Sequence, residues 1–212
     1  YHYDLFPLDN IQKLIDLLKE KPNLVGLNVT IPYKEQVIPF LDEISKSAKG
    51  IGAVNTIIIE NGKLKGYNTD AYGFEMSLRQ FLKPYHEHAL ILGTGGAAKA
   101  VQYVLEQLNI GYKYVSRTPS VGQFSYTELD ETILEKHKII INTTPLGMSP
   151  NIDKSPAIPY EFLTNEHLLY DLVYNPAISL FLQHGKVKGA AIKNGLEMLH
   201  LQAEEAWNIW RN

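Results

Sequence analysis

The sequence predicts an α/β protein of two domains, a doubly wound parallel sheet and a smaller α/β domain. Between residues 89 and 195, short apolar strands alternate with helical segments, which is typical of a parallel sheet. Residues 9–70 follow a different order: a helix, a strand and a hairpin. The chain has 212 residues, enough for two small domains. We expect residues 1–82 and 196–212 to form the smaller domain and residues 86–195 the larger.

The first elements of the smaller domain end at a lysine. Residues 1–6 and 24–31 have strand-like patterns, and residues 9–20 place apolar side chains at helical spacing behind an Asp/Asn cap. Pro32 suits a first helical turn, so a helix is expected there. Lys34 would then lie where a strand passes into a helix, a position that lines clefts in open α/β sheets.

A hairpin is predicted for residues 53–70. Asn61-Gly62 at its centre accepts the positive φ angles of a tight turn. The pair Asn-Thr occurs at both ends of the hairpin, and Asp70 is expected to open a helix over residues 70–82.

The larger domain follows a polar, linker-like segment at residues 83–88. Residues 89–108 predict a strand, a glycine turn and a helix. Further strands are expected within residues 112–118, 138–145, 168–176 and 189–195. The last segment, residues 196–212, predicts an amphipathic helix long enough to dock onto the first half of the chain.

The glycine turn predicts a phosphate site. Gly93, Gly95 and Gly96 follow a strand and, with Ala97, open a helix. Glycines permit a tight turn and close backbone approach, while a helix N-terminus offers N–H groups and partial positive charge to a phosphate. The sequence GxGGA is not the full GxGxxG motif, so a structural turn without a ligand is the alternative.

The end of the next strand favours NADP over NAD. An acidic residue there would bind the ribose hydroxyls of NAD, whereas this chain has Ser116, Arg117 and Thr118. A guanidinium pairs well with the additional phosphate of NADP. A solvated arginine after a strand is the alternative.

Composition narrows the class of partner. Apolar residues make up 45% of the chain, charged residues 20%, and the net charge is -3, which gives no electrostatic argument for nucleic acid or an anionic membrane. The chain has no cysteine, so disulfides and thiolate chemistry are excluded. No apolar run approaches the ~20 residues of a membrane span. We expect a small-molecule substrate and a cytoplasmic protein, either a monomer or a homodimer.

Several motifs resemble the shikimate dehydrogenase family, in the family's order and over essentially the whole chain. They are Asn28-x-Thr30-Ile31-Pro32-x-Lys34, Ala53-Val54-Asn55-Thr56, Asn68-Thr69-Asp70, INTTPLGM at 141–148, DLVYNP at 171–176 and NGLEMLHLQ at 194–202. The resemblance implies a Rossmann-like cofactor domain, a substrate domain, and NADP-dependent interconversion of shikimate and 3-dehydroshikimate in the pathway to aromatic amino acids.

The resemblance also implies roles for single residues. Lys34 and Asp70 are the catalytic pair, and we assign proton transfer to the two jointly. Substrate hydroxyls would be bound by the same pair with Thr30, Asn55, Tyr174 and Gln202. Besides the glycine turn and the strand end, the cofactor would contact Thr143, Gly195 and Met198. Ketone reduction fits this set, because it needs a proton donor at the oxygen where negative charge develops.

Other readings stay open. A quinate/shikimate dehydrogenase with relaxed NAD use is one, since no second basic residue follows Arg117 closely. A non-catalytic ligand-binding relative is another, because the family's N-terminal strand and helix, with a paired-serine motif, are expected to be lacking. No metal site is expected: His86 and His88 have no Cys or carboxylate partner at ligand spacing.

Overall fold

The computed structural model describes residues 2–211 as two compact units. The first consists of Tyr1–Asn68 with Ala206–Asn212, and the second of Thr69–Glu205. No helix among the described residues is long and apolar enough to cross a membrane.

Unit 1 is built on a four-stranded mixed sheet in the order β1-β3-β4-β2. Its strands are β1 (Gly26–Asn28), β2 (Glu43–Ile44), β3 (Thr56–Glu60) and β4 (Lys63–Tyr67). Its helices are η1 (Ile11–Lys13), α1 (Leu14–Glu20), η2 (Ile38–Phe40) and α2 (Lys46–Ile51). The core packs Leu14, Val37, Ala48, Val54, Ile57 and Leu64 together.

The predicted hairpin is confirmed. β3 and β4 pair antiparallel with Glu60 opposite Lys63, leaving a two-residue loop. Asn61 and Gly62 have φ values of 52° and 76°, the positive values that a tight hairpin turn requires.

Three local predictions in unit 1 are wrong. The described residues 2–8 form no strand, and the strand expected at 24–31 is limited to β1. Residues 31–37 form turns rather than a helix. The Val37 amide completes one helical bond to Tyr33 O, but Ile38 N bonds to Glu35 O and Pro39 has no N–H to continue the helical pattern.

The end of α7 (Leu196–Arg211) completes unit 1, as expected for a helix that docks onto the first half of the chain. Trp210 Nε1 donates to Ile57 O at 2.9 Å. Gly26 makes room for the indole, because a Cβ at this position would lie 2.2 Å from Trp210 Nε1.

Unit 2 contains a six-stranded, wholly parallel sheet in the order β10-β9-β8-β5-β6-β7, which confirms the predicted architecture. Its strands are β5 (His88–Leu92), β6 (Gly111–Ser116), β7 (Phe124–Ser125), β8 (Ile139–Asn142), β9 (Leu168–Asp171) and β10 (Ala191–Asn194). Besides most of α7, its helices are α3 (Thr69–Arg79), α4 (Gly96–Gln107), η3 (Tyr126–Glu128), α5 (Glu131–Lys136), η4 (Tyr160–Phe162) and α6 (Leu180–Val187).

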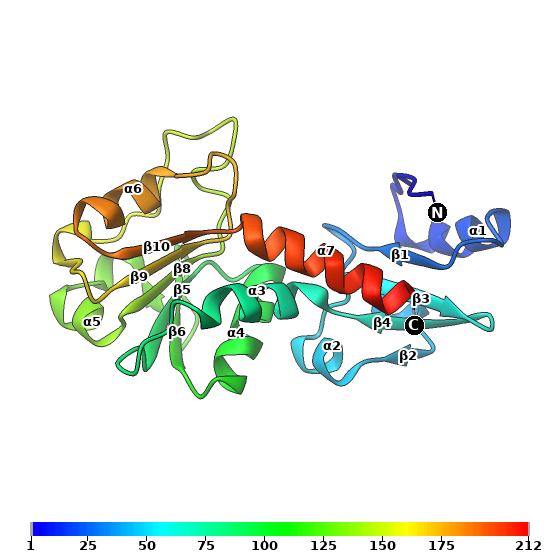
Figure 1. Cartoon of the computed structure of the whole chain (residues 1–212), viewed down its shortest axis with the longest axis horizontal. Helices are drawn as coiled ribbons and strands as arrows, with labels where there is room; N and C mark the ends of the chain where they lie inside the picture. Colours follow the sequence, from blue (N-terminus) through cyan, green and yellow to red (C-terminus); the bar gives the residue numbers. More distant parts are fainter. Residues whose placement is uncertain (1, 212) are drawn as a thin grey trace. The chain divides into compact units, whose positions relative to one another are not determined.

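Helices cover both faces of this sheet. Figure 1 shows α6 on one side and α4 on the other. Right-handed crossovers account for this, because the chain steps in opposite directions along the sheet from β5 to β6 and from β9 to β10. On the α6 face, Leu90, Ile140 and Leu169 join Leu134 and Phe181 in one buried cluster. The strand residues that alternate with these, including Ile91 and Tyr170, are also fully buried.

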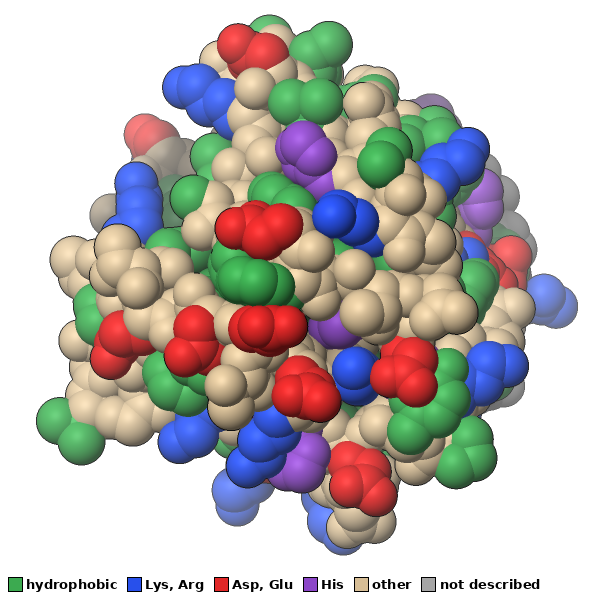
Figure 2. Space-filling model, turned by 90° about the vertical axis from the view of Figure 1, so that its left-hand side faces the viewer, with side chains coloured by type: hydrophobic (Ala, Val, Ile, Leu, Met, Phe, Trp, Pro, Cys, Tyr) green, Lys and Arg blue, Asp and Glu red, His purple; other side chains and the backbone are tan. Residues whose placement is uncertain are grey.

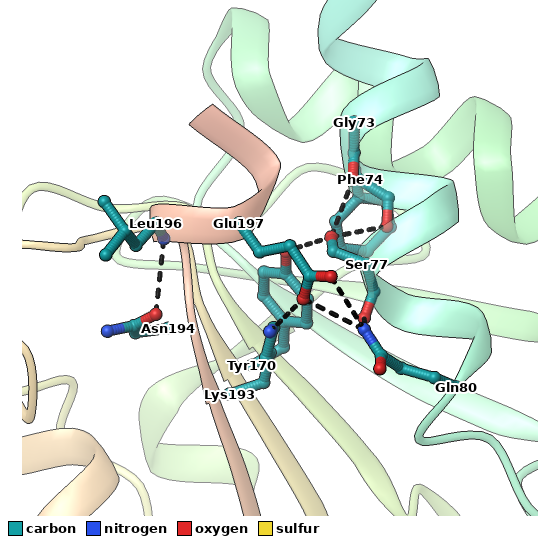
Figure 3. Close-up of polar contacts among 9 residues, drawn as sticks. All are labelled: Gly73, Phe74, Ser77, Gln80, Tyr170, Lys193, Asn194, Leu196 and Glu197. Carbon is teal, nitrogen blue, oxygen red and sulfur yellow. Dashed lines mark hydrogen bonds and ion pairs between the residues drawn. The ribbon is translucent and has the colours of Figure 1, made fainter. Parts of the chain in front are cut away.

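Helices α3 and α7 pack closely within unit 2. A Cβ at Gly73 of α3 would lie 2.5 Å from Met198 O. Figure 3 shows how the pair is held to the sheet: the hydroxyls of Ser77 and Tyr170 hydrogen-bond at 2.6 Å. Glu197 accepts from Gln80 and pairs with Lys193.

Charges are mixed on the face of the molecule that Figure 2 shows. Acidic and basic side chains are interspersed there, with no large area of one sign. This distribution agrees with the small net charge of -3.

Three histidines of unit 2 are buried: His86, His137 and His167 are 5%, 5% and 1% exposed. The segment at 83–88 is therefore not simply a polar linker. His86 Nδ1 accepts from Lys83 N at 3.1 Å and its Nε2–H donates to Glu166 O at 3.0 Å. His167 likewise contacts Leu134 O at 3.0 Å. Both ring nitrogens of His86 are occupied by backbone groups, which explains its burial without a metal.

Acid is expected to destabilise the fold through these histidines. Burial lowers the pKa of His86, His137 and His167. Since the unfolded rings take up protons at about pH 6.5, the unfolded state binds more protons below that pH, and stability falls as pH falls. Urea titrations from about pH 7.5 to about pH 5.5 should give a falling free energy of unfolding.

His86→Asn should reduce this pH dependence, because it removes one of the three groups. One carboxyl opposes the trend: burial raises the pKa of Asp171 to about 6, so its protonation below that pH favours the folded state. A free energy of unfolding that stays level or rises over the whole range would refute the prediction.

Candidate active site

The glycine turn after β5 has the geometry of a phosphate cradle. Gly93 has a φ of 103°, and a Cβ there would lie 2.9 Å from Thr143 Oγ1, so both conformation and space require glycine. At Gly95 and Gly96 an added Cβ would meet nothing within 4 Å. The backbone is therefore open where α4 begins. Gly95 caps this helix without a side-chain hydrogen bond, leaving the N-terminus to be satisfied by a ligand or water.

Arg117 directly follows β6, the strand beside β5. Ser116 ends the strand and its Oγ accepts from Thr118 N at 3.2 Å, so a local turn directs the chain away from the sheet. Arg117 and Thr118 are exposed. Burial raises the pKa of Tyr126, and the positive charge of Arg117 opposes this rise. Arg117 therefore lies at the carboxyl edge of the sheet, where an arginine can bind the 2′-phosphate of NADP.

The topological switch point of the sheet, where the strand order changes direction, lies between β5 and β8. β6 lies on one side of β5 and β8 on the other, so the carboxyl ends of β5 and β8 border the crevice in which open α/β sheets bind ligands. Thr143 follows β8 and its Oγ1 donates to Leu92 O at 2.7 Å. The structure thus places Thr143 beside the glycine turn, while its role in cofactor binding stays a prediction.

The two helices of Figure 3 carry two further predicted residues. Asp70 lies in the first turn of α3, which begins at Thr69, one residue earlier than predicted. A carboxylate in a first turn interacts favourably with the helix dipole. Thr69 Oγ1 contacts Gln202 Oε1 of α7 at 3.4 Å. Asp70 and Gln202 therefore both belong to this helix pair of unit 2.

Unit 1 holds the other part of the predicted set. Lys34 lies in the turns that follow β1, is partly buried, and accepts from Val54 N through its backbone oxygen at 2.7 Å. Asn55 is 3% exposed, and its backbone bridges both neighbouring segments: its oxygen accepts from Val29 N at 2.8 Å and its N–H donates to Tyr67 O at 3.0 Å. These contacts fix the backbone on which Lys34 and Asn55 are carried.

A cavity of about 1000 Å³ lies in unit 1. Its wall is largely apolar and comes from residues 2–8, α1, β1 and the last turn of α7. Polar groups on it include Asn28, Thr30 and Tyr33, while the described lining contains neither Lys34 nor Asn55. Thr30 is thus exposed on the cavity wall.

The remaining predicted residues lie at the start of α7 and after β9. Gly195 is buried, and a Cβ there would lie 2.2 Å from Leu172 O, so its glycine is required by packing whatever else it contacts. Met198 is 9% exposed, and Tyr174 is 46% exposed. Among residues 2–211 no group of three potential ligands could hold a metal ion.

The chain is similar to known proteins along most of its length. A family model described as the shikimate dehydrogenase substrate binding domain matches residues 1–57. The NADP(+) shikimate dehydrogenase of Carboxydothermus hydrogenoformans is 44% identical over 203 residues, which cover 89% of this chain and 72% of the relative. The chain belongs to the shikimate dehydrogenase family.

Solved structures of dehydrogenases share the fold. The Thermus thermophilus shikimate 5-dehydrogenase in complex with NADP(H) and shikimate matches with a TM-score of 0.82 and 33% identity, over 95% of this chain and 78% of that chain. A quinate dehydrogenase from Corynebacterium glutamicum in complex with NAD matches with a TM-score of 0.85 and 27% identity, over 95% of this chain and 77% of that chain.

Sequence reasoning about this family member missed one buried polar cluster. Asp171 and Asn142 are fully buried at the carboxyl ends of β9 and β8. Both are polar residues at the ends of otherwise apolar strands, and that signal was available in the sequence. The compact units also divide at Asn68 and Ala206, whereas the functional boundaries at 82–86 and 195–196 remain predictions.

Proposed function

We propose that the chain is an NADP-dependent oxidoreductase that interconverts 3-dehydroshikimate and shikimate in the route to chorismate and the aromatic amino acids. The observation that carries this proposal is the similarity to the NADP(+) shikimate dehydrogenase of Carboxydothermus hydrogenoformans across most of both chains. The open glycine turn at the start of α4 and Arg117 after β6 support NADP as the cofactor. The cytoplasmic location expected from the sequence is part of this proposal.

The cofactor supplies hydride chemistry when bound, and the residues of the chain have the other tasks. Gly95 and Gly96 leave space for the pyrophosphate, and Arg117 pairs with the 2′-phosphate. Thr143, Gly195 and Met198 border the nicotinamide end. A charge-neutral set of hydroxyl and amide groups orients the substrate: Thr30, Asn55, Tyr174 and Gln202.

Lys34 and Asp70 carry the proton transfer in this proposal. Reduction of a ketone places negative charge on its oxygen, and an ammonium group stabilises that charge and gives it a proton. In the oxidation direction the hydroxyl proton returns to the pair. Unpaired ring hydroxyls or site groups would cost about 1–3 kcal/mol each, which explains the number of polar residues assigned to the substrate.

A matrix of initial rates tests the proposal. Reduction of the nicotinamide is followed with shikimate or quinate, each combined with NADP or NAD. Fast turnover with shikimate and NADP supports it. A folded protein that binds NADPH but reduces no cofactor with either substrate would contradict it and favour the non-catalytic relative.

A quinate/shikimate dehydrogenase that uses NAD is the second candidate. Pro119, Ser120 and Val121 follow Thr118, so no second cation stands directly after Arg117 in sequence. The fold is also shared with a quinate dehydrogenase in complex with NAD. Comparable rates with quinate and NAD in the same matrix would select this candidate.

A further inference from the structure

The carboxylate of Asp171 lies at the carboxyl end of β9, and the proposed function gives it no role. Its side chain is fully buried. Oδ1 accepts from Asn142 Nδ2 at 2.9 Å and from Val173 N at 3.0 Å, and Oδ2 accepts from Ser179 Oγ. A buried carboxylate is costly without such donors. Burial raises its pKa to about 6, so at neutral pH it is ionised and only accepts.

Asn142 connects the Asp171 carboxylate to the loop after β8. It stands opposite Asp171 in the sheet register and is fully buried. Because the carboxylate only accepts, Asn142 must direct its NH₂ group at Asp171, which leaves its oxygen for the loop. Asn142 Oδ1 accepts from Thr144 N at 3.0 Å and from Thr144 Oγ1 at 2.6 Å. The orientation of one amide therefore determines where Thr144 lies.

Thr144 in turn lies against the glycine turn. A Cβ at Gly93 would be 3.0 Å from Thr144 Cγ2. Thr143, the neighbour of Thr144, is equally close to Gly93 and bonds to Leu92. The loop after β8 thus forms one side of the turn that receives the cofactor phosphates in the proposed function.

On its other side, the Asp171 carboxylate holds Ser179 at the start of α6. Ser179 caps this helix, its Oγ accepting from Leu182 N at 3.5 Å. Gly147 has a φ of 88°, and a Cβ there would lie 3.2 Å from Ser179 Cβ. The loop 143–147 is therefore held at one end by Asn142 and rests at the other end on the cap of α6.

We propose that Asp171 is a positioning residue for the nicotinamide cofactor, because through Asn142 and Thr144 it holds loop 143–147 against the glycine turn at 93–95. The inference rests on the proposed function in that it takes this turn as the NADP site. It adds that cofactor affinity depends on a buried side chain that does not itself contact the cofactor.

Two variants and a matched control test the proposal. Asp171→Ala removes the acceptor of Asn142 and Ser179. Thr144→Val keeps the shape of the loop but removes its hydroxyl bond to Asn142, and it decides the question if Asp171→Ala does not fold. His167→Ala is the control. His167 is buried directly before the first residue of β9, whereas Asp171 is the last residue of this strand, and His167 bonds to Thr164 and Leu134 rather than to the loop after β8.

The readouts separate positioning from general stability. We expect the Kd for NADPH to rise at least about tenfold in Asp171→Ala and about threefold in Thr144→Val, with the KM for shikimate changed less than about twofold. Amide hydrogen exchange over residues 93–95 and 143–147 should accelerate in both variants. His167→Ala should lower the urea midpoint while leaving the Kd and this exchange unchanged.

Unchanged exchange in Thr144→Val, or NADPH affinity within about twofold of the wild type in every folded variant, would overturn the positioning role. Failure of the wild-type chain to bind NADPH would instead refute the proposed function. Amide exchange would still report whether Asp171 orders the loop, so the two failures are distinguishable.

Discussion

Lys34→Ala is expected to lower turnover of shikimate by about 100- to 10,000-fold, the range that general acid–base groups contribute. NADPH binding should persist, because the glycine turn and Arg117 belong to unit 2 whereas Lys34 belongs to unit 1. Steady-state rates and NADPH fluorescence titrations measure the two effects separately.

Lys34→Arg refines this test. Arginine keeps the positive charge but does not release a proton near neutral pH. Activity restored by arginine would point to charge stabilisation, and activity still lost would point to proton transfer. Lys46→Ala, at the exposed start of α2, is the control and should behave as the wild type. A Lys34→Ala enzyme that retained more than about a tenth of the wild-type rate would remove Lys34 from catalysis.

Arg117→Ala should change cofactor choice. Charge-assisted hydrogen bonds contribute about 1.5–3 kcal/mol, so loss of the guanidinium should raise the KM for NADP about 10- to 100-fold. The KM for NAD, which has no 2′-phosphate, should change little. Steady-state kinetics with both cofactors give the ratio of the KM for NADP to the KM for NAD.

The matched control for this change is Arg79→Ala. Arg79 is an exposed arginine that pairs with Glu75 on α3, so its loss should leave the preference for NADP intact. Equal losses with NADP and NAD in Arg117→Ala would show that Arg117 supports the local fold rather than the 2′-phosphate.

The sequence predicted those parts of the fold that depend on local patterns. The pair Asn61-Gly62 predicted the hairpin, and the short apolar runs within residues 89–195 predicted the strands of the parallel sheet. Each of these signals is contained in a few consecutive residues. The helix expected after Pro32 was wrong, since Pro39 ends the helical pattern after one turn.

Tertiary contacts account for what the sequence could not predict. The burial of His86 depends on Glu166, 80 residues away, and neither residue alone signals the contact. The Asp171 network likewise joins strands that are adjacent only in the folded sheet. For the candidate site, the cofactor role of Gly93, Gly95 and Gly96 was predicted from the motif itself, whereas the roles predicted for Lys34 and Asp70 rest on resemblance to the family.

The docking of Trp210 has a consequence for protein synthesis. The end of α7 contributes to the packing of unit 1, because the Trp210 indole donates to Ile57 O and lies against Gly26. This end of α7 leaves the ribosome after all of unit 2. The sheet of unit 1 is translated before unit 2, so it cannot acquire its full set of contacts until the segment that carries Trp210 has left the ribosome, whereas Thr69–Glu205 is a continuous segment that can complete its own packing earlier.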